Sequence, residues 1–579
     1  RGVVPIRFGA DALGGAVNLV STNASLRTGG AASYEVGSFG TYRAALTGRF
    51  RDPGSGFTAG ITAFLDHSAN DYAVYVDVPD RRGRLHEMRV PRFHDAYTAF
   101  GGSAEVGFAG TSWARRLLLR FYGTGYRKEL QHNIFMTVPY GEAEYGERVY
   151  GASLRYEQDR LFGANASIEL LTSLGRRTME LYDMSRNRYG WDGRIVRQVP
   201  VPGEIHGPAD DVYWEWTSFS RLLLRWAPAP EHELSATVTP TYSTRTGDDR
   251  LVDQTMTFDP LALSQDLTTV VSGLSYRLRL FDERLENELF GKHYFYHVRG
   301  EDLLAGDTVR TLTSDSMHWG VGEALRFRFE EWIWAKASYE YATRLPRPDE
   351  LFGDGAFVLP NLELRPEESH NVNAGAQLDV RDEQSTGRWQ AQVNLFARIY
   401  DHRIVAYSDA NTTVYRNILS ASTFGAEASI AWTSPGRYVS LQANGTIQDQ
   451  RNTSSTGEFA NYRGDRVPNV PWLFFNVAAQ IRVPDVLAGG DAFVLGWDTR
   501  YVHEFFRTWE SVGLGGGKDD HSRIPAQLVH GLHVSYQLPG PVRTSTTFEI
   551  RNLTDERVYD YVGVQRAGRS FHLKLTLHL

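Results

Sequence analysis

The chain has 579 residues, enough for several ordinary domains, yet no Pro/Gly/Ser-rich linker, charge block or low-complexity tract divides it. The net charge of −8 and the absence of Cys exclude a basic nucleic-acid-binding surface, disulfide bonds and thiolate chemistry. The sequence holds no run of about 20 apolar residues, which a membrane-spanning helix requires. A helical membrane protein is therefore excluded, whereas a β-barrel, whose strands alternate in polarity, is not.

The first 21 residues differ in composition from the rest of the chain. Residues 1–21, "RGVVPIRFGADALGGAVNLVS", are rich in glycine and small apolar residues and read like the end of a domain. We expect Gly9, Gly14 and Gly15 where the backbone passes close to another surface or adopts a positive φ, because glycine has no Cβ. An ordinary turn is an equally good interpretation of any one of them.

From there to the last residue, apolar and polar side chains alternate with a period of two. The alternation is clear in residues 57–65, 233–242, 389–399 and 439–448. In the third of these, Trp389, Val393, Leu395 and Ile399 fall on one face. Such a pattern predicts strands with one apolar face, and we expect about ten residues per strand, the length that crosses a bilayer at a tilt.

The connections between these strands alternate in length. Short turns are expected at 51–56, 228–233, 281–286 and 433–437, and long polar loops at 175–216, 341–368 and 448–471. Short turns at one end and long loops at the other are typical of outer-membrane barrels. A soluble propeller or sandwich is disfavoured, because its strands are shorter and a propeller repeats a blade motif that is absent here.

The last nine residues, "FHLKLTLHL", place Phe571, Leu573, Leu575, Leu577 and Leu579 on one face of a strand that ends with the chain. A barrel in lipid must pair its last strand with its first, since no edge is left open. At about 25 residues per strand and its loop, the chain holds about 22 strands, a size associated with a plugged lumen. We therefore predict an all-β fold, a transmembrane antiparallel β-barrel.

Four motifs occur in order along the chain. They are Arg1-Gly2 with Phe8-Gly9, Ala12–Gly15 and Asn18–Ser21; "RLPRPDELFGDGAFVLPNLELRPEESHNVNAG" at 344–375; "GDRVPNVP" at 464–471; and the stretch from Asn552-Leu553-Thr554-Asp555 through Gly568-Arg569. Together they resemble the TonB-dependent outer-membrane receptor family. The resemblance implies that residues 1–28 are the C-terminal remnant of the plug domain and residues 29–579 the barrel.

The resemblance also implies a function. Members of this family import a scarce ligand, and the TonB complex acts on a plug whose front, including the TonB-contacting box, would precede Arg1. We expect a bacterial outer-membrane protein that imports a ferric siderophore or similar metal chelate and contacts lipopolysaccharide, with no enzymatic activity, cofactor, resident metal or nucleic-acid partner. A passive pore, a surface-binding scaffold, and an importer of oligosaccharide or peptide are the alternatives, and a further partner protein stays unidentified.

Plug arginines of the family meet barrel glutamates and so lock the plug. By this resemblance Arg1 and Glu427 form such a pair, and the second glutamate position carries Asn373. Independently, Glu427 stands among small and apolar residues on a predicted strand and should face the lumen, where a charge packed against protein needs a partner. A merely solvated lumen carboxylate is the competing interpretation.

The long loop after residue 175 combines cations with aromatic rings. Such a set holds an anionic ligand by bidentate hydrogen bonds and a planar one by stacking. The candidate ligand-binding residues are Tyr182, Arg186, Arg188, Tyr189, Trp191, Arg194 and Arg197. Loop aromatics also stabilise loops, which is the competing interpretation.

Haem and catalysis are both disfavoured. The segment 353–360 lacks the histidine that haem receptors of the family carry there, although His132, His206 and His521 lie in other loops. The sequence contains neither His-Glu-x-x-His nor Gly-x-Ser-x-Gly, and the run "GLGGGK" lacks the spacing of a phosphate-binding loop.

Overall fold

The computed structural model describes residues 3–15, 28–80, 82–161, 165–252, 259–304, 308–408, 412–515 and 522–579. Among these residues, no helix is long and apolar enough to cross a membrane.

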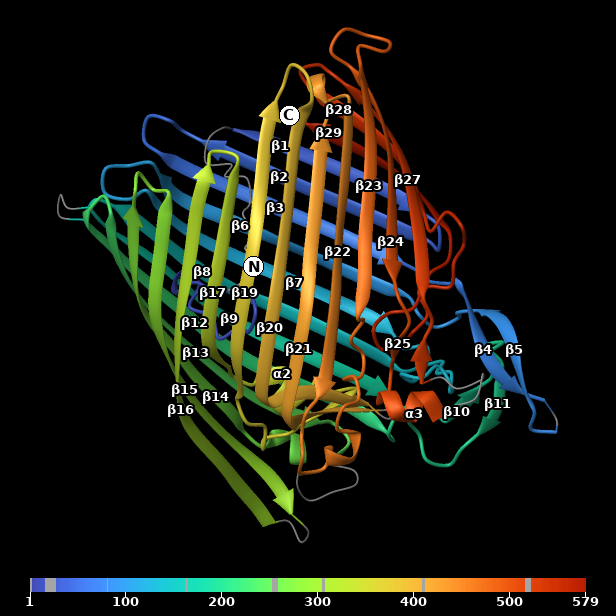
Figure 1. Ribbon diagram of the computed structural model, residues 1–579. Coiled ribbons are helices and arrows are strands. Elements are labelled where there is room, and N and C mark those ends of the chain that lie inside the picture. The colour runs from blue at the N-terminus through green and yellow to red at the C-terminus, as the bar shows by residue number, and fades with distance from the viewer. Residues whose placement is uncertain are drawn as a thin grey trace.

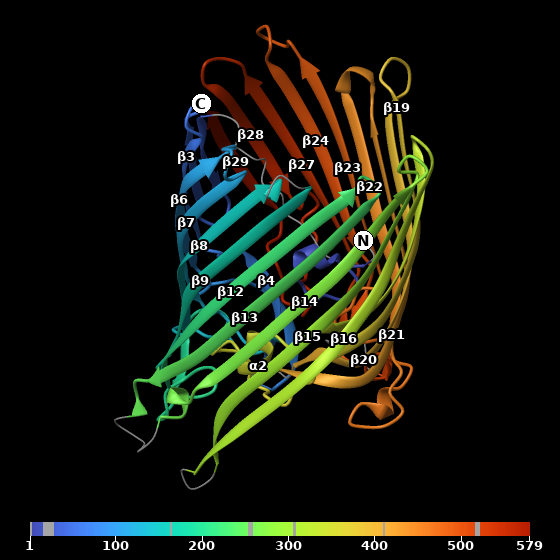
Figure 2. The same cartoon turned by 90° about the vertical axis from the view of Figure 1, so that its left-hand side faces the viewer.

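Twenty-two long strands form one closed antiparallel barrel, and they run obliquely around it (Figures 1 and 2). This confirms the predicted fold class. The barrel strands within the described ranges are β1 (Gly29–Gly37), β2 (Thr41–Arg51), β3 (Phe57–Ser68), β6 (Tyr97–Ala109), β7 (Arg116–Glu129), β8 (Glu144–Asp159), β9 (Ala166–Asp183), β12 (Ala209–Ala229), β13 (His232–Asp249), β14 (Gln265–Leu280), β15 (Leu285–Leu304), β16 (Thr308–Glu330), β17 (Ile333–Arg344), β19 (Glu367–Asp382), β20 (Gly387–Ser408), β21 (Thr413–Thr433), β22 (Val439–Asn452), β23 (Leu473–Pro484), β24 (Ala492–Val502), β27 (Gln527–Leu538), β28 (Arg543–Arg551) and β29 (Ser570–His578).

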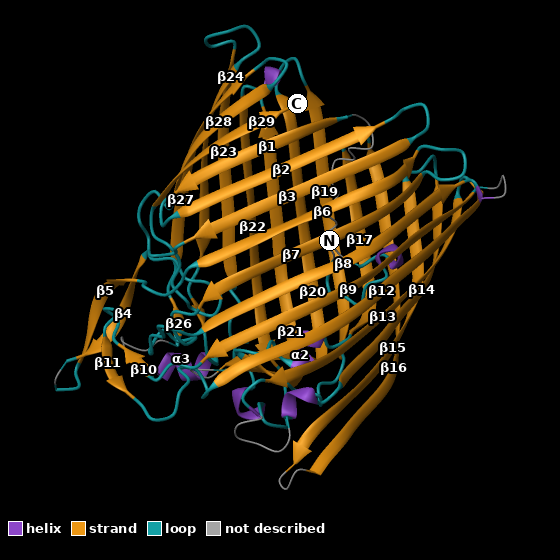
Figure 3. Ribbon diagram, turned by 180° about the vertical axis from the view of Figure 1, so that it is seen from behind, coloured by secondary structure: helices purple, strands orange, loops and turns teal. Residues whose placement is uncertain are grey.

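The remaining elements are short and belong to connections or to the front of the chain. They are η1 (Ile6–Phe8), β4 (Ala73–Pro79), β5 (Leu85–Pro91), β10 (Asn187–Tyr189), β11 (Ile195–Gln198), η3 (Pro260–Ala262), α2 (Pro348–Phe352), β18 (Val358–Leu359), η4 (Pro435–Arg437), η5 (Ala460–Tyr462), β25 (Phe505–Phe506), α3 (Glu510–Gly515) and β26 (Arg523–Ile524). Figure 3 shows that α2 and α3 lie at the same end of the barrel as the hairpins β4–β5 and β10–β11.

The two faces of each barrel strand have opposite character. On β20, Trp389, Leu395 and Ile399 are exposed on the outside, whereas Asn394 and Phe396 are buried inside. The period-two pattern therefore places apolar side chains toward lipid and the intervening residues toward the lumen.

The barrel closes where the last strand meets the first. β29 pairs with β28 on one side and with β1 on the other, from Ala31↔His578 to Gly37↔His572. Inside this junction the buried carboxylate of Glu35 lies 3.2 Å from His572 Nδ1. The predicted pairing of the two chain ends is confirmed.

The connections have the predicted asymmetry. One end carries short turns, from two residues at 230–231 to seven at 485–491, whereas the other end carries loops such as 184–208 and 345–366. In the turn after β2, Asp52 accepts hydrogen bonds from the amides of Gly54 and Ser55 at 3.2 and 3.1 Å.

Two predicted dimensions are wrong. The barrel strands have nine to 23 residues, and the longest are more than twice the expected ten, because paired hairpins continue past the bilayer at the long-loop end. For the same reason the loop expected at 175–216 shrinks to 184–208: β9 and β12 stay hydrogen-bonded up to the pair Asp183↔Ala209.

Candidate functional site

The N-terminal segment, residues 3–15, lies within the lumen and is held by one side of the wall, where β19 alone separates β17 from β20. The amide of Val4 donates to Glu340 Oε2 of β17 at 3.1 Å. Arg398 Nη2 of β20 donates to the carbonyl of Gly14 at 3.2 Å. The wall therefore holds the segment by hydrogen bonds to its backbone. Because backbone atoms do not depend on residue type, the amino-acid sequence of the segment does not reveal these contacts.

Two glycines of this segment allow close approach to the wall. A Cβ at Gly9, whose φ is 57°, would lie 1.9 Å from Thr239 Oγ1. A Cβ at Gly14, whose φ is 77°, would lie 2.4 Å from Arg398 Cζ. Gly15 also has a positive φ, 152°, but faces open space, so only its backbone conformation favours glycine.

Glu340 is itself half of a buried ion pair. Its Oε1 lies 2.6 Å from Lys292 Nζ of β15, and the two side chains are 0% and 2% exposed. A buried carboxylate of this kind requires a cation and hydrogen bonds on its remaining lone pairs. Lys292 supplies the cation and the Val4 amide supplies one hydrogen bond.

A second lumen element, which we name the inserted loop, comprises residues 345–366. Its first amide, that of Leu345, donates to Asp11 Oδ2 of the N-terminal segment at 2.8 Å. Leu345, Leu351 and other apolar side chains of the loop pack in one buried cluster with inward-facing residues of β14 and β15. The two lumen elements are thus joined to each other as well as to the wall.

Arg245 of β13 fixes the middle of the inserted loop. Its fully buried guanidinium pairs with Glu215 at 2.7 Å and donates to the carbonyls of Phe352 and Gly353 at 3.1 and 2.7 Å. The planar fork of an arginine suits this double role, because one edge meets the carboxylate and the other meets the backbone.

Two further contacts hold the loop against the neighbouring strands. Arg177 of β9 bridges Glu147 of β8 and Asp349 of α2, each at 2.8 Å. Tyr145 of β8 donates through its hydroxyl to the carbonyl of Asp354 at 3.0 Å. The inserted loop is therefore anchored along most of its length.

Cavities of ligand size remain where this loop meets the wall. One, of about 670 Å³, lies between loop residues 355–360 and Asp211, Tyr213 and Arg245. Another, of about 550 Å³, is lined by loop residues 362–366 with His318, Glu368 and His402. Small-molecule sites in proteins commonly have such volumes.

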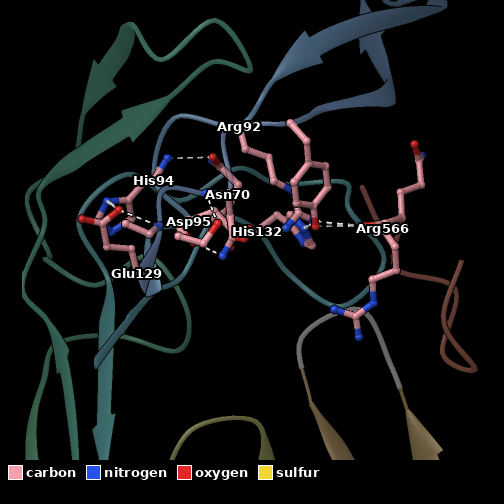
Figure 4. A network of polar contacts seen from close by, with 12 residues as sticks. Asn70, Arg92, His94, Asp95, Glu129, His132 and Arg566 are labelled. Carbon is pink, nitrogen blue, oxygen red and sulfur yellow. Dashed lines mark hydrogen bonds and ion pairs between the residues drawn. The ribbon is translucent and has the colours of Figure 1, made fainter. Parts of the chain in front are cut away.

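Above the lumen, the long loops are tied together by a polar network (Figure 4). Arg92 forms a buried ion pair with Asp95, and its Nη2 contacts His132 Nε2 at 2.8 Å and the carbonyl of Gln565 at 3.3 Å. Asn70 donates to the Asp95 carbonyl at 3.0 Å. Loops that follow β3, β7 and β28 are thereby held as one unit.

His132 is neutral in this network. Its Nε2 accepts from Arg92, so its Nδ1 carries the proton and donates to the carbonyl of Asn133 at 2.7 Å. Burial, followed by the Arg92 charge, lowers the pKa of His132 to about 3.

The residues predicted to bind ligand are dispersed: three of the seven hold their own loop, and the other four are exposed. Tyr182 points outward from the end of β9 and is exposed. The Arg188 guanidinium donates to the carbonyls of Ser185, Asn187 and Gly203. Arg186, Arg194 and Arg197 are also exposed.

The two aromatic members of this loop are engaged as well. Tyr189 donates to Glu142, and Trp191 is buried in an apolar cluster with Val74, Val90 and Met136. The structure thus brings Arg188 and these two rings into contacts that stabilise the loop.

The residues predicted to lock the plug are described in part. Glu427 lies on β21 opposite Asn394, whose side chain faces the lumen. Asn373 is buried on β19, and neither atom of its amide has a hydrogen-bond partner within the described ranges. Arg1 lies outside the described residues.

The sequence analysis missed Glu340, Lys292, Arg398 and Arg245. In the sequence, the only feature that distinguishes these four residues is that each is charged and falls at an inward-facing position of a strand. Many other residues of the lumen wall share this feature, so it does not identify those that contact the N-terminal segment.

A closed barrel of 22 strands with an apolar exterior and an occupied lumen defines the class of plugged outer-membrane transporters. Comparisons with known proteins point to one family within this class. Residues 294–553 match the family described as TonB dependent receptor-like, beta-barrel. A comparison with curated protein sequences finds no match.

Solved structures share the fold at low sequence identity. The copper transporter OprC has a TM-score of 0.69 at 14% identity, covering 96% of this chain and 80% of that chain. The siderophore receptor PiuA from Acinetobacter baumannii has 0.69 at 13%, with 96% and 82% covered. The ferric-catecholate import receptor Fiu from E. coli K12, in its closed form, has 0.66 at 12%, with 96% and 82% covered.

Residues 294–553 therefore resemble the barrel of this family, and the solved structures show that nearly the whole chain shares their fold.

We expect Glu340→Gln to leave the Lys292 ammonium buried without a counter-charge. The free energy of unfolding should fall by about 3 to 5 kcal/mol, measured by denaturant unfolding in lipid bilayers. The double variant Lys292→Met/Glu340→Leu removes both charges and should recover most of this loss. Equal stability of Glu340→Gln and the wild type would contradict the role of the pair.

We expect the loop network around His132 to weaken in acid. The released loop binds a proton at pKa 6.5 and the folded loop only near 3, so stability is complete above about pH 6.5 and declines below it, by at most about 1.4 kcal/mol per pH unit. Hydrogen exchange of residues 130–143 should therefore accelerate as the pH falls, after correction for intrinsic rates. His132→Gln lacks this titration, and an equal acid response in that variant would refute the assignment.

Proposed function

We propose that this protein is a TonB-dependent receptor of the bacterial outer membrane that imports a scarce small ligand, and that the ligand is a ferric siderophore or a similar metal chelate. The observation that carries the proposal is the link between the N-terminal segment and the inserted loop, from Asp11 to Leu345. The solved structures with this fold include siderophore and iron receptors, which supports the choice of ligand.

The geometry supports coupling by force. In this proposal TonB contacts a part of the plug that precedes the N-terminal segment, and a pull on that segment is opposed by its contacts with Glu340, Arg398 and Leu345. Each is a single hydrogen bond, so each contributes only about 0.5 to 3 kcal/mol. The segment is thus held firmly enough to close the pore at rest and weakly enough to be displaced.

Ligand entry would begin at the loops and end at the cavities beside the inserted loop. Of the loop residues predicted to bind ligand, Arg186 and Arg194 are exposed, and we propose that they attract an anionic chelate.

In the same proposal, residues 1–28 act as the end of the plug and residues 29–579 as the barrel.

Uptake measurements test this function. A strain that lacks the gene should grow poorly under iron limitation when a ferric chelate is the sole iron source, and should fail to accumulate radioactive iron from it. Dissipating the proton-motive force should abolish uptake in the wild type but leave surface binding intact. Normal growth together with absent chelate binding would refute the ligand, and uptake that persists without proton-motive force would refute the coupling.

Loss of the proposed lock should make the barrel leak. Glu427→Ala removes the lumen carboxylate that the family resemblance pairs with Arg1, so the plug should be released more often and sensitivity to large antibiotics should rise. Ser429→Ala, two residues along the same strand face, is the matched control. Arg1→Ala should reproduce the leak, and unchanged antibiotic sensitivity in both charge variants would show that the pair does not hold the plug.

A further inference from the structure

One arginine on the outside of the barrel has no counter-charge among the described residues. Arg176 of β9 forms no ion pair with any carboxylate in the described part of the chain, although its neighbours do. On the same outer surface Arg148 pairs with Glu180, and Arg127 pairs with Glu144. A guanidinium that faces the membrane requires an anion, because it cannot lose its proton.

Aromatic side chains flank this guanidinium on both adjacent strands. Arg176 pairs across the sheet with Tyr150 of β8 and Trp216 of β12, which are 48% and 42% exposed. Its Nη1 donates to the Tyr150 hydroxyl at 3.2 Å, and its Cζ lies 5.6 Å from the Trp216 ring centroid. Its Nε is buried and has no hydrogen-bond partner within the described ranges, and its Nη2 forms no hydrogen bond there and is not buried.

The position along the strand coincides with a membrane interface. Ten residues separate Ala166, at the short-turn end of β9, from Arg176. At about 3.3 Å per residue and a tilt of about 40°, Arg176 stands about 25 Å above that end, which equals the height of the apolar band of such barrels.

The outer surface of the barrel changes from apolar to charged at the level of Arg176. Leu174 and Phe121, on the membrane side of Arg176, are exposed apolar residues. Beyond Arg176 the outer surface carries the ion pairs of Arg148 and Arg127. Paired tyrosine and tryptophan rings at this boundary are typical of the level of lipid headgroups.

We propose that Arg176, with Tyr150 and Trp216, binds the phosphate of a phosphorylated glycolipid in the outer leaflet. Nη2 of the guanidinium supplies a charge-assisted hydrogen bond to a phosphate oxygen, and the two rings pack against the sugar to which the phosphate is attached. The apolar surface around Leu174 and Phe121 contacts the acyl chains.

Native mass spectrometry of the detergent-solubilised full-length receptor tests the site, with bisphosphorylated lipid A and its dephosphorylated form as probes. The wild type should bind the bisphosphorylated lipid about tenfold more tightly than the dephosphorylated one, and Arg176→Gln should lose this preference. Equal binding of the two lipids by the wild type, or an undiminished preference in Arg176→Gln, would overturn the proposal.

The matched control is Arg127→Gln/Glu144→Gln, which removes a neighbouring cation together with its carboxylate and should keep the preference. An equal loss in that variant would mean that general surface charge, and not Arg176, attracts the lipid, and would overturn the assignment. Excess inorganic phosphate should displace little lipid; complete displacement would identify a soluble-anion site instead. Thermal unfolding without added lipid should be the same for all variants and so exclude misfolding.

Discussion

The structure depends on one constraint: in lipid, every backbone amide and carbonyl must find its partner within the protein. A sheet satisfies this only by closing, and here β29 meets β1 in register. Closure in turn requires side chains to alternate between lipid and lumen along every strand. Outward positions such as Leu395 are apolar for this reason, and the polar content of the chain is concentrated inside and at the ends.

Closure creates a lumen that is too wide for side chains alone to fill. The chain occupies it with the N-terminal segment and the inserted loop, and the charges that line the wall bind them. Glu340 and Arg245 each combine an ion pair with hydrogen bonds to the backbone of a lumen element. Partners from distant parts of the sequence hold these charges in place. The two lumen elements therefore bind at defined positions, although the wall is polar throughout.

The sequence predicts the periodic part of this molecule well. Period-two alternation identifies the lipid face of β20, and the final strand identifies closure, because both follow from local pattern. Strand length is not local: β9 and β12 continue as a paired hairpin to Asp183↔Ala209, and polar loop-like composition conceals that pairing. Likewise Trp191 has the composition of a ligand-stacking residue, yet it is buried among side chains of other loops. The family resemblance predicted the end of the plug, but not Glu340 as the residue that holds Val4.

The contacts of the two lumen elements also differ in strength, and this difference bears on how the pore would open. The N-terminal segment is held by separate hydrogen bonds to its backbone, whereas Arg245, Arg177 and an apolar cluster anchor the inserted loop. A force on the segment should therefore break the Asp11 to Leu345 bond before it disturbs Arg245, because a single, partly buried hydrogen bond is weaker than a buried ion pair with two further bonds. The segment would then leave while the loop, with its adjoining cavities, stays against the wall, so in the proposed function the part that moves is separate from the part that receives ligand.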